Sequence, residues 1–133
     1  MKRAGIIIAT LAMTTSVVAA KPSLWSYERI DNGLFQIGVA WGVKENCATI
    51  KENRFNGISY SLGLYNYARG QGYSHKEVKT FLDDDSEKEK LRVRVTQWFL
   101  DQGLNPDTPN ALCSFGNDQI TQRTQVGKLL KSN

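Results

Sequence analysis

The chain has 133 residues, of which 41% are hydrophobic, and a formal net charge of +4 at pH 7. That length allows one domain with a core of its own. The excess of positive charge is too small to indicate binding to nucleic acid or to an anionic membrane surface.

Residues 1–20 predict an export signal. Lys2 and Arg3 precede an apolar run that ends in small residues, which is the order of a secretory signal peptide. The alternative is a transmembrane anchor, but threonines thin the hydrophobicity and no basic stop-transfer cluster follows. We therefore expect cleavage before Lys21, a periplasmic location, and a mature single domain over 21–133 with a net charge of +2. No later segment has the length of apolar sequence needed to span a bilayer.

Two apolar stripes at helical spacing follow. Residues 26–46 predict a helix with one apolar face, formed by Ile30, Leu34, Ile37 and Trp41. Residues 54–69 repeat the pattern with Phe55, Ile58, Leu62 and Tyr65. Gly70 and Gly72 then provide C-terminal stops. We expect both stripes to face the core.

The sharpest local signal is a helix start at Ser74. Glu77 stands three residues later, which is the pattern of a capping box, and Tyr73 and Val78 are placed to form a hydrophobic staple around it. The sequence therefore predicts a short helix that runs through Leu82.

The acidic run 83–87 predicts the start of the next helix, since Lys88 and Lys90 follow one turn later and this order complements the helix dipole. This helix should stop at Gly103. Calcium also takes several oxygen ligands. However, the run lacks the Gly-centred, alternating ligands of an EF-hand loop, so we favour a solvated helix start and expect no metal.

A last long helix is predicted from about Pro109 to Arg123, after a turn over 106–109. The inner face of this helix contains Leu112, Ile120 and either Phe115 or Gly116. The tail that follows, with Val126, Leu129 and Leu130, can fold back on the helix. Alternating strand patterns are nearly absent, and the best strand candidate, 91–95, is better explained as helix. The expected fold is all-α, an irregular antiparallel bundle of about five helices.

Cys47 and Cys113 are the two cysteines of the chain, and an even count in a protein bound for an oxidising compartment indicates a disulfide first. The bridge closes a loop of about 67 residues, which the chain-entropy model values at about 4 kcal/mol. A redox pair or a metal site is the alternative. Redox thiols are usually close in sequence, and zinc needs more ligands than one histidine and two cysteines readily provide. We therefore favour a structural bridge.

His75 is the single histidine, and it follows a helix cap, where most residues are exposed to solvent. A catalytic histidine needs a nucleophile or an orienting carboxylate, and no motif indicates either. Four cations within residues 88–94 could bind phosphate, but Glu87 and Glu89 interleave with them, so a salt-bridged surface is favoured. No cofactor motif is found.

Tyr60 and Tyr67 are seven residues apart and share a helical face that differs from the core stripe. With Arg69 they form a candidate interaction surface, because aromatic residues and arginine are enriched at protein interfaces. The alternative, which we favour, is that these tyrosines cover a second helix packed behind them.

The second half of the chain resembles an uncharacterised family, a domain of unknown function, of small exported helical proteins from alphaproteobacteria. The residues that carry the likeness are caps, core positions and cysteines: 72–74, 77–78, 81–82, 87–88, Cys113, Gly116, Ile120 and 127–130, together with Cys47. The resemblance implies a signal peptide, a helical domain and one disulfide, and it supplies no catalytic residues. Some members are encoded near genes for respiratory NADH-quinone oxidoreductase, which implies a partner in an envelope complex.

The sequence thus favours binding over catalysis. The leading hypothesis is a non-catalytic periplasmic protein that binds another protein of the cell envelope, as an accessory or assembly factor. The alternative is a small-molecule carrier, with an apolar cavity between helices. Its lining would come from Phe35, Trp41, Trp98 or Phe99. An enzyme ranks last, and the oligomeric state is not predicted.

Overall fold

The computed structural model describes residues 20–133, so the predicted export signal lies outside the described residues apart from Ala20. The structure is 68% helical and carries the Cys47–Cys113 bridge, which confirms the predicted all-α fold. In chain order the elements are η1 (Leu24–Ser26), α1 (Glu28–Glu45), β1 (Ile50–Glu52), α2 (Arg54–Gly70), α3 (His75–Asp83), α4 (Asp85–Asp101), α5 (Cys113–Gln122), α6 (Gln125–Lys128) and β2 (Leu130–Ser132).

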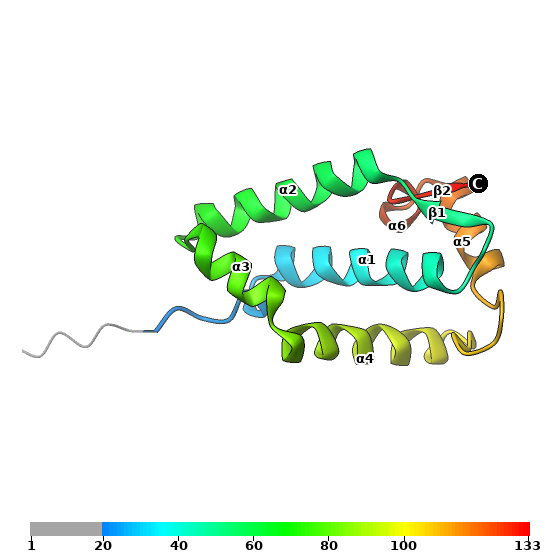
Figure 1. The fold of residues 1–133 in the computed structure, drawn as a ribbon, viewed down its shortest axis with the longest axis horizontal. Coiled ribbons are helices and arrows are strands. Elements are labelled where there is room, and N and C mark those ends of the chain that lie inside the picture. Colours follow the sequence, from blue (N-terminus) through cyan, green and yellow to red (C-terminus); the bar gives the residue numbers. More distant parts are fainter. Residues whose placement is uncertain (1–19) are drawn as a thin grey trace, which may run out of the picture.

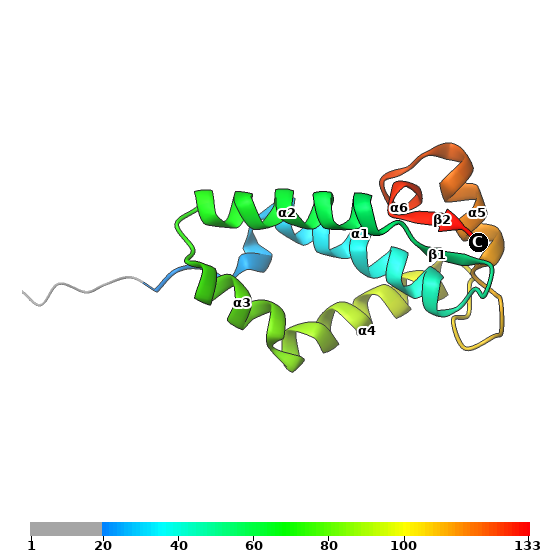
Figure 2. The same cartoon turned by 45° about the horizontal axis from the view of Figure 1, so that its top comes forward.

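Helix α1 lies in the middle of the molecule, with α2 along one side and α4 along the other (Figure 1). Helix α3 connects these two outer helices at one end, and it also contacts both of them. At the other end, α5, α6 and the two strands gather around the end of α1. Figure 2 shows the same order after a turn of 45°. The architecture is therefore a three-helix layer that is closed at both ends by shorter elements.

The predicted start of α3 is present in full. Ser74 Oγ accepts a hydrogen bond from Glu77 N at 3.1 Å, and Glu77 Oε2 accepts one from Ser74 N at 2.6 Å. Tyr73 and Val78 are both buried, as the hydrophobic staple requires. Gly72 has a φ of +96°, a backbone conformation that favours glycine, so the chain turns sharply between α2 and α3.

A glycine in α1 allows α4 to approach closely. A Cβ atom at Gly42 would lie 2.7 Å from the ring of Phe99, which is closer than van der Waals contact permits. Phe99 is 1% exposed and belongs to the main core cluster, together with Val39, Val43 and Leu112. The absence of a side chain at position 42 therefore lets the Phe99 ring pack against the backbone of α1.

The predicted inner faces of α1 and α2 are partly wrong. Ile30 is buried, but Trp41 is 59% exposed, and on α2 Phe55 is 82%, Ile58 70% and Leu62 53% exposed. The buried residues of α1 lie elsewhere on the helix, at Gly33, Val39, Ala40 and Val43, and those of α2 at Leu64 and Ala68. The physical reason is that α1 is covered from two sides and from its C-terminal end. Its buried surface is wide and made of small residues, which a search for large apolar residues does not detect.

The region around residue 110 also differs from the prediction. Helix α5 begins at Cys113 instead of Pro109, because Asn110 has a φ of +57° and residues 105–112 form turns. Leu112 is fully buried and anchors this turn in the core. The inner face of α5 is otherwise confirmed, since Gly116 is buried and Phe115 and Ile120 pack against the main core.

The C-terminal tail folds back as predicted, but it ends in a strand. Val126, Leu129 and Leu130 are buried. Strand β2 pairs antiparallel with β1, in a register that places Lys51 opposite Lys131 and Glu52 opposite Leu130. This short ribbon was not predicted, since two three-residue strands offer too few positions for an alternating pattern.

Candidate functional site

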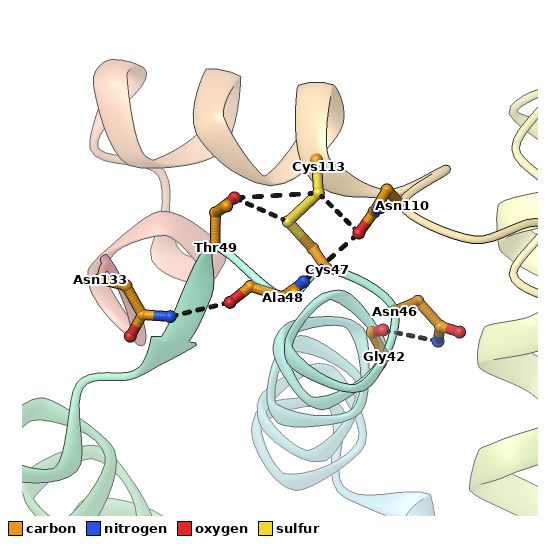
Figure 3. Close-up of a disulfide and its surroundings, with 8 residues drawn as sticks. All are labelled: Gly42, Asn46, Cys47, Ala48, Thr49, Asn110, Cys113 and Asn133. Carbon is orange, nitrogen blue, oxygen red and sulfur yellow. Dashed lines mark hydrogen bonds between the residues drawn. A yellow bond between two sulfur atoms is a disulfide. The ribbon is translucent and has the colours of Figure 1, made fainter.

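The disulfide joins the end of α1 to the first residue of α5. The S–S distance is 2.01 Å and the Cα atoms are 5.0 Å apart. Thr49 Oγ1 lies 3.3 Å from Cys47 Sγ, and Asn110 Oδ1 accepts a long hydrogen bond, 3.5 Å, from Ala48 N (Figure 3). The chain on both sides of the bridge is therefore held by polar contacts as well as by the covalent bond.

The environment of the two sulfur atoms favours a structural role for the bridge. Cys47 is 2% exposed and belongs to the main core cluster, whereas Cys113 is half-buried. An external thiolate would have to attack the more accessible sulfur of Cys113 and expel Cys47 as a thiolate. Burial in apolar surroundings raises the energy of that thiolate. Thiol exchange is therefore disfavoured.

The C-terminus is fastened beside the disulfide. Asn133 Nδ2 donates a hydrogen bond of 2.8 Å to the carbonyl oxygen of Ala48 (Figure 3). The backbone N–H of Asn133 donates one of 3.0 Å to the carbonyl oxygen of Thr49. The loop after α1 thus carries both a covalent link to α5 and a backbone link to the end of the chain.

His75 lies on the surface, next to Tyr65 and Arg69. Its Nδ1 atom is 3.1 Å from the hydroxyl oxygen of Tyr65, which in turn accepts a hydrogen bond of 3.0 Å from Arg69. All three side chains belong to the junction of α2 and α3, and their contacts connect the end of one helix to the start of the next.

Tyr60 and Tyr67 both lie on the side of α2 that faces α1. Tyr60 is half-buried against the main core, and burial raises the pKa of its hydroxyl above the ordinary value of 10.0. The Tyr67 ring meets that of Tyr27 edge to face, with centroids 6.2 Å apart, and Arg29 lies over it at 5.0 Å. Arg69, the third residue of the predicted interaction surface, is exposed and turned to Tyr65. The structure does not bring these three residues together on one open face.

The charged residues around α4 are arranged as a helix start and its ion pairs. Asp84 caps the helix by accepting a hydrogen bond of 3.0 Å from Glu87 N, and Glu87 pairs with Lys90 at 2.8 Å. Arg94 reaches Asp31 on α1 at 2.9 Å. Within residues 20–133, no group of three or more histidine, cysteine or acidic residues is placed to hold a metal ion.

The aromatic residues proposed to line a carrier cavity do not all share one space, since Phe35 and Trp98 border an open groove of about 460 Å³ whereas Phe99 is buried in the core. Phe35, Phe99 and Phe115 each meet the Trp98 ring edge to face, with centroid distances from 5.4 to 5.7 Å. These rings contact one another where α1, α4 and α5 meet. Trp41 lies on a different side of α1, where it is exposed.

The most distinctive surface feature is an exposed apolar area on α1 and α2, which we call the α1–α2 face. It consists of Trp41, Phe55, Ile58 and Leu62, each more than half exposed. At about 200 Å² for a fully exposed aromatic side chain, the two rings alone expose on the order of 300 Å². The largest apolar patch on a typical monomer is about 300–600 Å² and is often functional. Sequence periodicity found these residues but assigned them to the core.

A groove of about 400 Å³ adjoins this face, between the C-terminal half of α1 and the N-terminal half of α2. Its apolar lining is Ile37, Ala40, Trp41, Ile58, Leu129 and Leu130. Lys44 Nζ lies 4.2 Å from the centroid of the Trp41 ring, and Arg54 borders the opposite wall. The groove is thus mainly apolar, with Lys44, Glu52 and Arg54 at its edge.

These features define a class: a small helical protein, closed by one disulfide, with an open apolar face. None of the helices within residues 20–133 combines the length and the hydropathy needed to cross a membrane. The chain belongs to the family described as a family of unknown function (DUF5333), whose model matches residues 22–131. No curated protein and no solved structure matches it.

Proposed function

We propose that this protein is an exported, non-catalytic accessory or assembly factor that binds a protein of the cell envelope through the α1–α2 face. The observation that carries the proposal is the exposure of four large apolar side chains on neighbouring helices. The exposure of this much apolar surface to water is unfavourable in free energy, and burial against a partner removes the unfavourable contribution. A binding partner therefore accounts for a surface that the fold itself does not need.

Two further observations support binding over catalysis. The sulfur atoms are bonded to each other, and the His75 ring is engaged with Tyr65 at the surface. The disulfide supports export, because such bonds form and persist in oxidising compartments such as the periplasm.

The proposal is tested by affinity capture from periplasm and solubilised membranes with isotope-labelled quantification. The bait variants are Trp41→Ser and Ile58→Ser, which change the face. The matched controls are Val93→Ser and Leu100→Ser, which remove apolar side chains of similar exposure from α4. We expect one partner to be recovered with the wild type and both controls, and to be lost with the two face variants.

A partner recovered equally with face and control variants would move the binding site elsewhere on the molecule. Recovery of no specific partner under any solubilisation would contradict the proposed function itself. Each bait is first checked on a non-reducing gel for its disulfide, so that a misfolded variant is not counted as a loss of binding.

A further inference from the structure

A second groove, of about 510 Å³, lies between α1, α2 and α6. Its polar lining residues come from one side of each helix, since they are three or four residues apart: Arg29 and Asn32 on α1, Asn56 and Tyr60 on α2, and Gln125 and Lys128 on α6. The groove beside the α1–α2 face shares no lining residue with it. The two grooves therefore lie on different sides of α2.

The charge of this second groove is positive. Arg29 and Lys128 line it, and no aspartate or glutamate does. Among residues 20–133 neither cation takes part in a salt bridge. The other polar groups of the lining are amides and hydroxyls, which can donate hydrogen bonds. An anion would therefore meet two cations and several donors here, whereas a metal cation would meet no carboxylate.

The Tyr67 ring positions the guanidinium group of Arg29. The Arg29 Cζ atom lies 5.0 Å from the centroid of this ring, within the range of a cation–π contact. Contact with a ring does not use the N–H groups as donors to an oxygen. They therefore stay available for a carboxylate or a phosphate, whose oxygens match the fork of a guanidinium with two parallel hydrogen bonds.

Tyr60 places a hydroxyl group in the same groove. Its side chain is half-buried, and burial raises the pKa of the hydroxyl above 10.0, while the nearby Arg29 guanidinium opposes this rise in pKa. The hydroxyl is therefore neutral at physiological pH and keeps a proton to donate. A neutral donor beside a cation is the combination that an anionic oxygen requires.

The two cations lie towards opposite ends of the groove. Asn56 Nδ2 donates a hydrogen bond of 2.8 Å to the backbone carbonyl oxygen of Lys128, which holds α6 beside the start of α2. Tyr67, which Arg29 contacts, lies about three turns, or roughly 16 Å, further along α2. The groove volume is also within the usual range for small-molecule sites, about 300–1,000 Å³. The groove thus suits an elongated small molecule.

From these observations we infer that the groove between α1, α2 and α6 is a second binding site, for a small anionic molecule that carries a carboxylate or a phosphate group. Arg29 and the Tyr60 hydroxyl hold the anionic group. The amides along the groove bind the polar remainder of the molecule, and Lys128 meets its far end. This site goes beyond the proposed function, because it shares no residue with the α1–α2 face and both can be occupied at once.

The lining disfavours two other kinds of occupant. A helix of a partner protein would need apolar contacts, but apart from the Tyr60 ring the groove offers Leu64 as its one large apolar side chain. A neutral sugar would leave both cations without a partner. An anionic lipid headgroup has the same chemistry as a free phosphate, and the experiment distinguishes these two sources.

The test uses ¹⁵N-labelled protein purified from cells that express the full chain. Two-dimensional NMR spectra follow its titration with sodium pyrophosphate and with sodium succinate, at an ionic strength kept constant with sodium chloride. We expect at least one of the two probes to produce saturable shifts of the amide signals around the groove. The probe that binds more tightly identifies the anionic group as phosphate or carboxylate.

Variants then test the residues that hold the anion. Arg29→Gln should weaken binding about tenfold or more, since a hydrogen bond to a charged group contributes this much. Tyr60→Phe should weaken it severalfold. Lys51→Gln is the matched control, because it removes an equal charge from an exposed lysine that does not line the groove, and it should bind the probe as the wild type does.

Vesicles identify the source of the anionic group. Sedimentation with vesicles of phosphatidylglycerol and phosphatidylcholine, compared with vesicles of phosphatidylcholine alone, is measured for the wild type and for Arg29→Gln. Sedimentation that requires phosphatidylglycerol and is lost in Arg29→Gln would place the group on a lipid headgroup. Binding of the free probe without such sedimentation would place it on a soluble molecule.

The inference would be overturned if neither probe produced saturable shifts, or if the shifts lay outside the groove. Equal weakening by Arg29→Gln and Lys51→Gln would also overturn it, since the probe would then respond only to the net charge of the protein. Trp41→Ser, which changes the α1–α2 face, should bind the probe as the wild type does. Failure of this site and failure of the proposed function are therefore separate results.

Discussion

The substitution Phe55→Ala should leave the free energy of unfolding almost unchanged. Complete burial of such a side chain is worth about 1.5–3 kcal/mol, so the buried fifth of Phe55 contributes only about 0.3–0.6 kcal/mol. Alanine recovers about 0.5 kcal/mol through its higher helix propensity. The two effects nearly cancel. If Phe55 faced the core, as its periodicity predicts, the same change would cost about 3–5 kcal/mol.

Leu64→Ala on the same helix is the matched comparison. Leu64 is 9% exposed and packs over Gly33 of α1, so its truncation should cost about 2–4 kcal/mol. Both variants are measured by urea unfolding of the mature domain. A shift of the urea midpoint at an unchanged slope m gives the change in the free energy of unfolding. A loss of 2 kcal/mol or more in Phe55→Ala, or a negligible loss in Leu64→Ala, would show that α2 turns its other side to the core.

Three further outcomes follow from the structure. Replacing Cys47 and Cys113 by alanine should lower the free energy of unfolding by about 4 kcal/mol in a denaturant titration, because the unfolded chain loses its cross-link. Gly127→Ala should lower the thermal midpoint strongly in calorimetry, since its Cβ would lie 1.8 Å from a backbone carbonyl oxygen of α5. The pKa of Glu77 is lowered from 4.5 to about 2, first by the Lys21 ammonium and then by a backbone N–H. This carboxylate therefore stabilises the fold above about pH 4.5, and the contribution is lost as the pH falls towards 2.

Each of these outcomes has its own control. Wild type treated with a reductant should match the double alanine variant, and an unchanged midpoint in both would contradict the role of the bridge. Gly70→Ala, where a Cβ meets nothing within 4 Å, should be harmless. Glu77→Gln should reduce the loss of unfolding free energy between pH 4.5 and pH 2. An unchanged pH dependence in this variant would show that the ion pair between Glu77 and Lys21 does not form.

The features that depend on a few residues alone, such as a helix cap or a single cysteine pair, were predicted correctly from the sequence. Ser74 and Glu77 predicted the start of α3 because both partners of a capping box lie within four residues and need nothing from the rest of the chain. The bridge between Cys47 and Cys113 was likewise predicted, since only one pairing is possible for two cysteines. Each of these features depends on few residues.

The orientation of α2 could not be read from the sequence. Periodicity shows that Phe55, Ile58 and Leu62 share a side of the helix, but it does not show whether the domain or another protein covers that side. The side that packs on α1 is made of Leu64, Ala68 and half-buried tyrosines, a mixture that looks less apolar. The candidate site was therefore hidden in a stripe that resembles a core.

The central claim, that a partner covers the α1–α2 face in the cell, is tested most directly by hydroxyl-radical footprinting. Trp41 and Phe55 are compared in the intact envelope and in the purified protein, with the exposed Leu100 of α4 as the internal reference. We predict strong labelling of both rings after purification and severalfold protection in the envelope, with Leu100 alike in both. Equal labelling of Trp41 and Phe55 in the two states would contradict the claim.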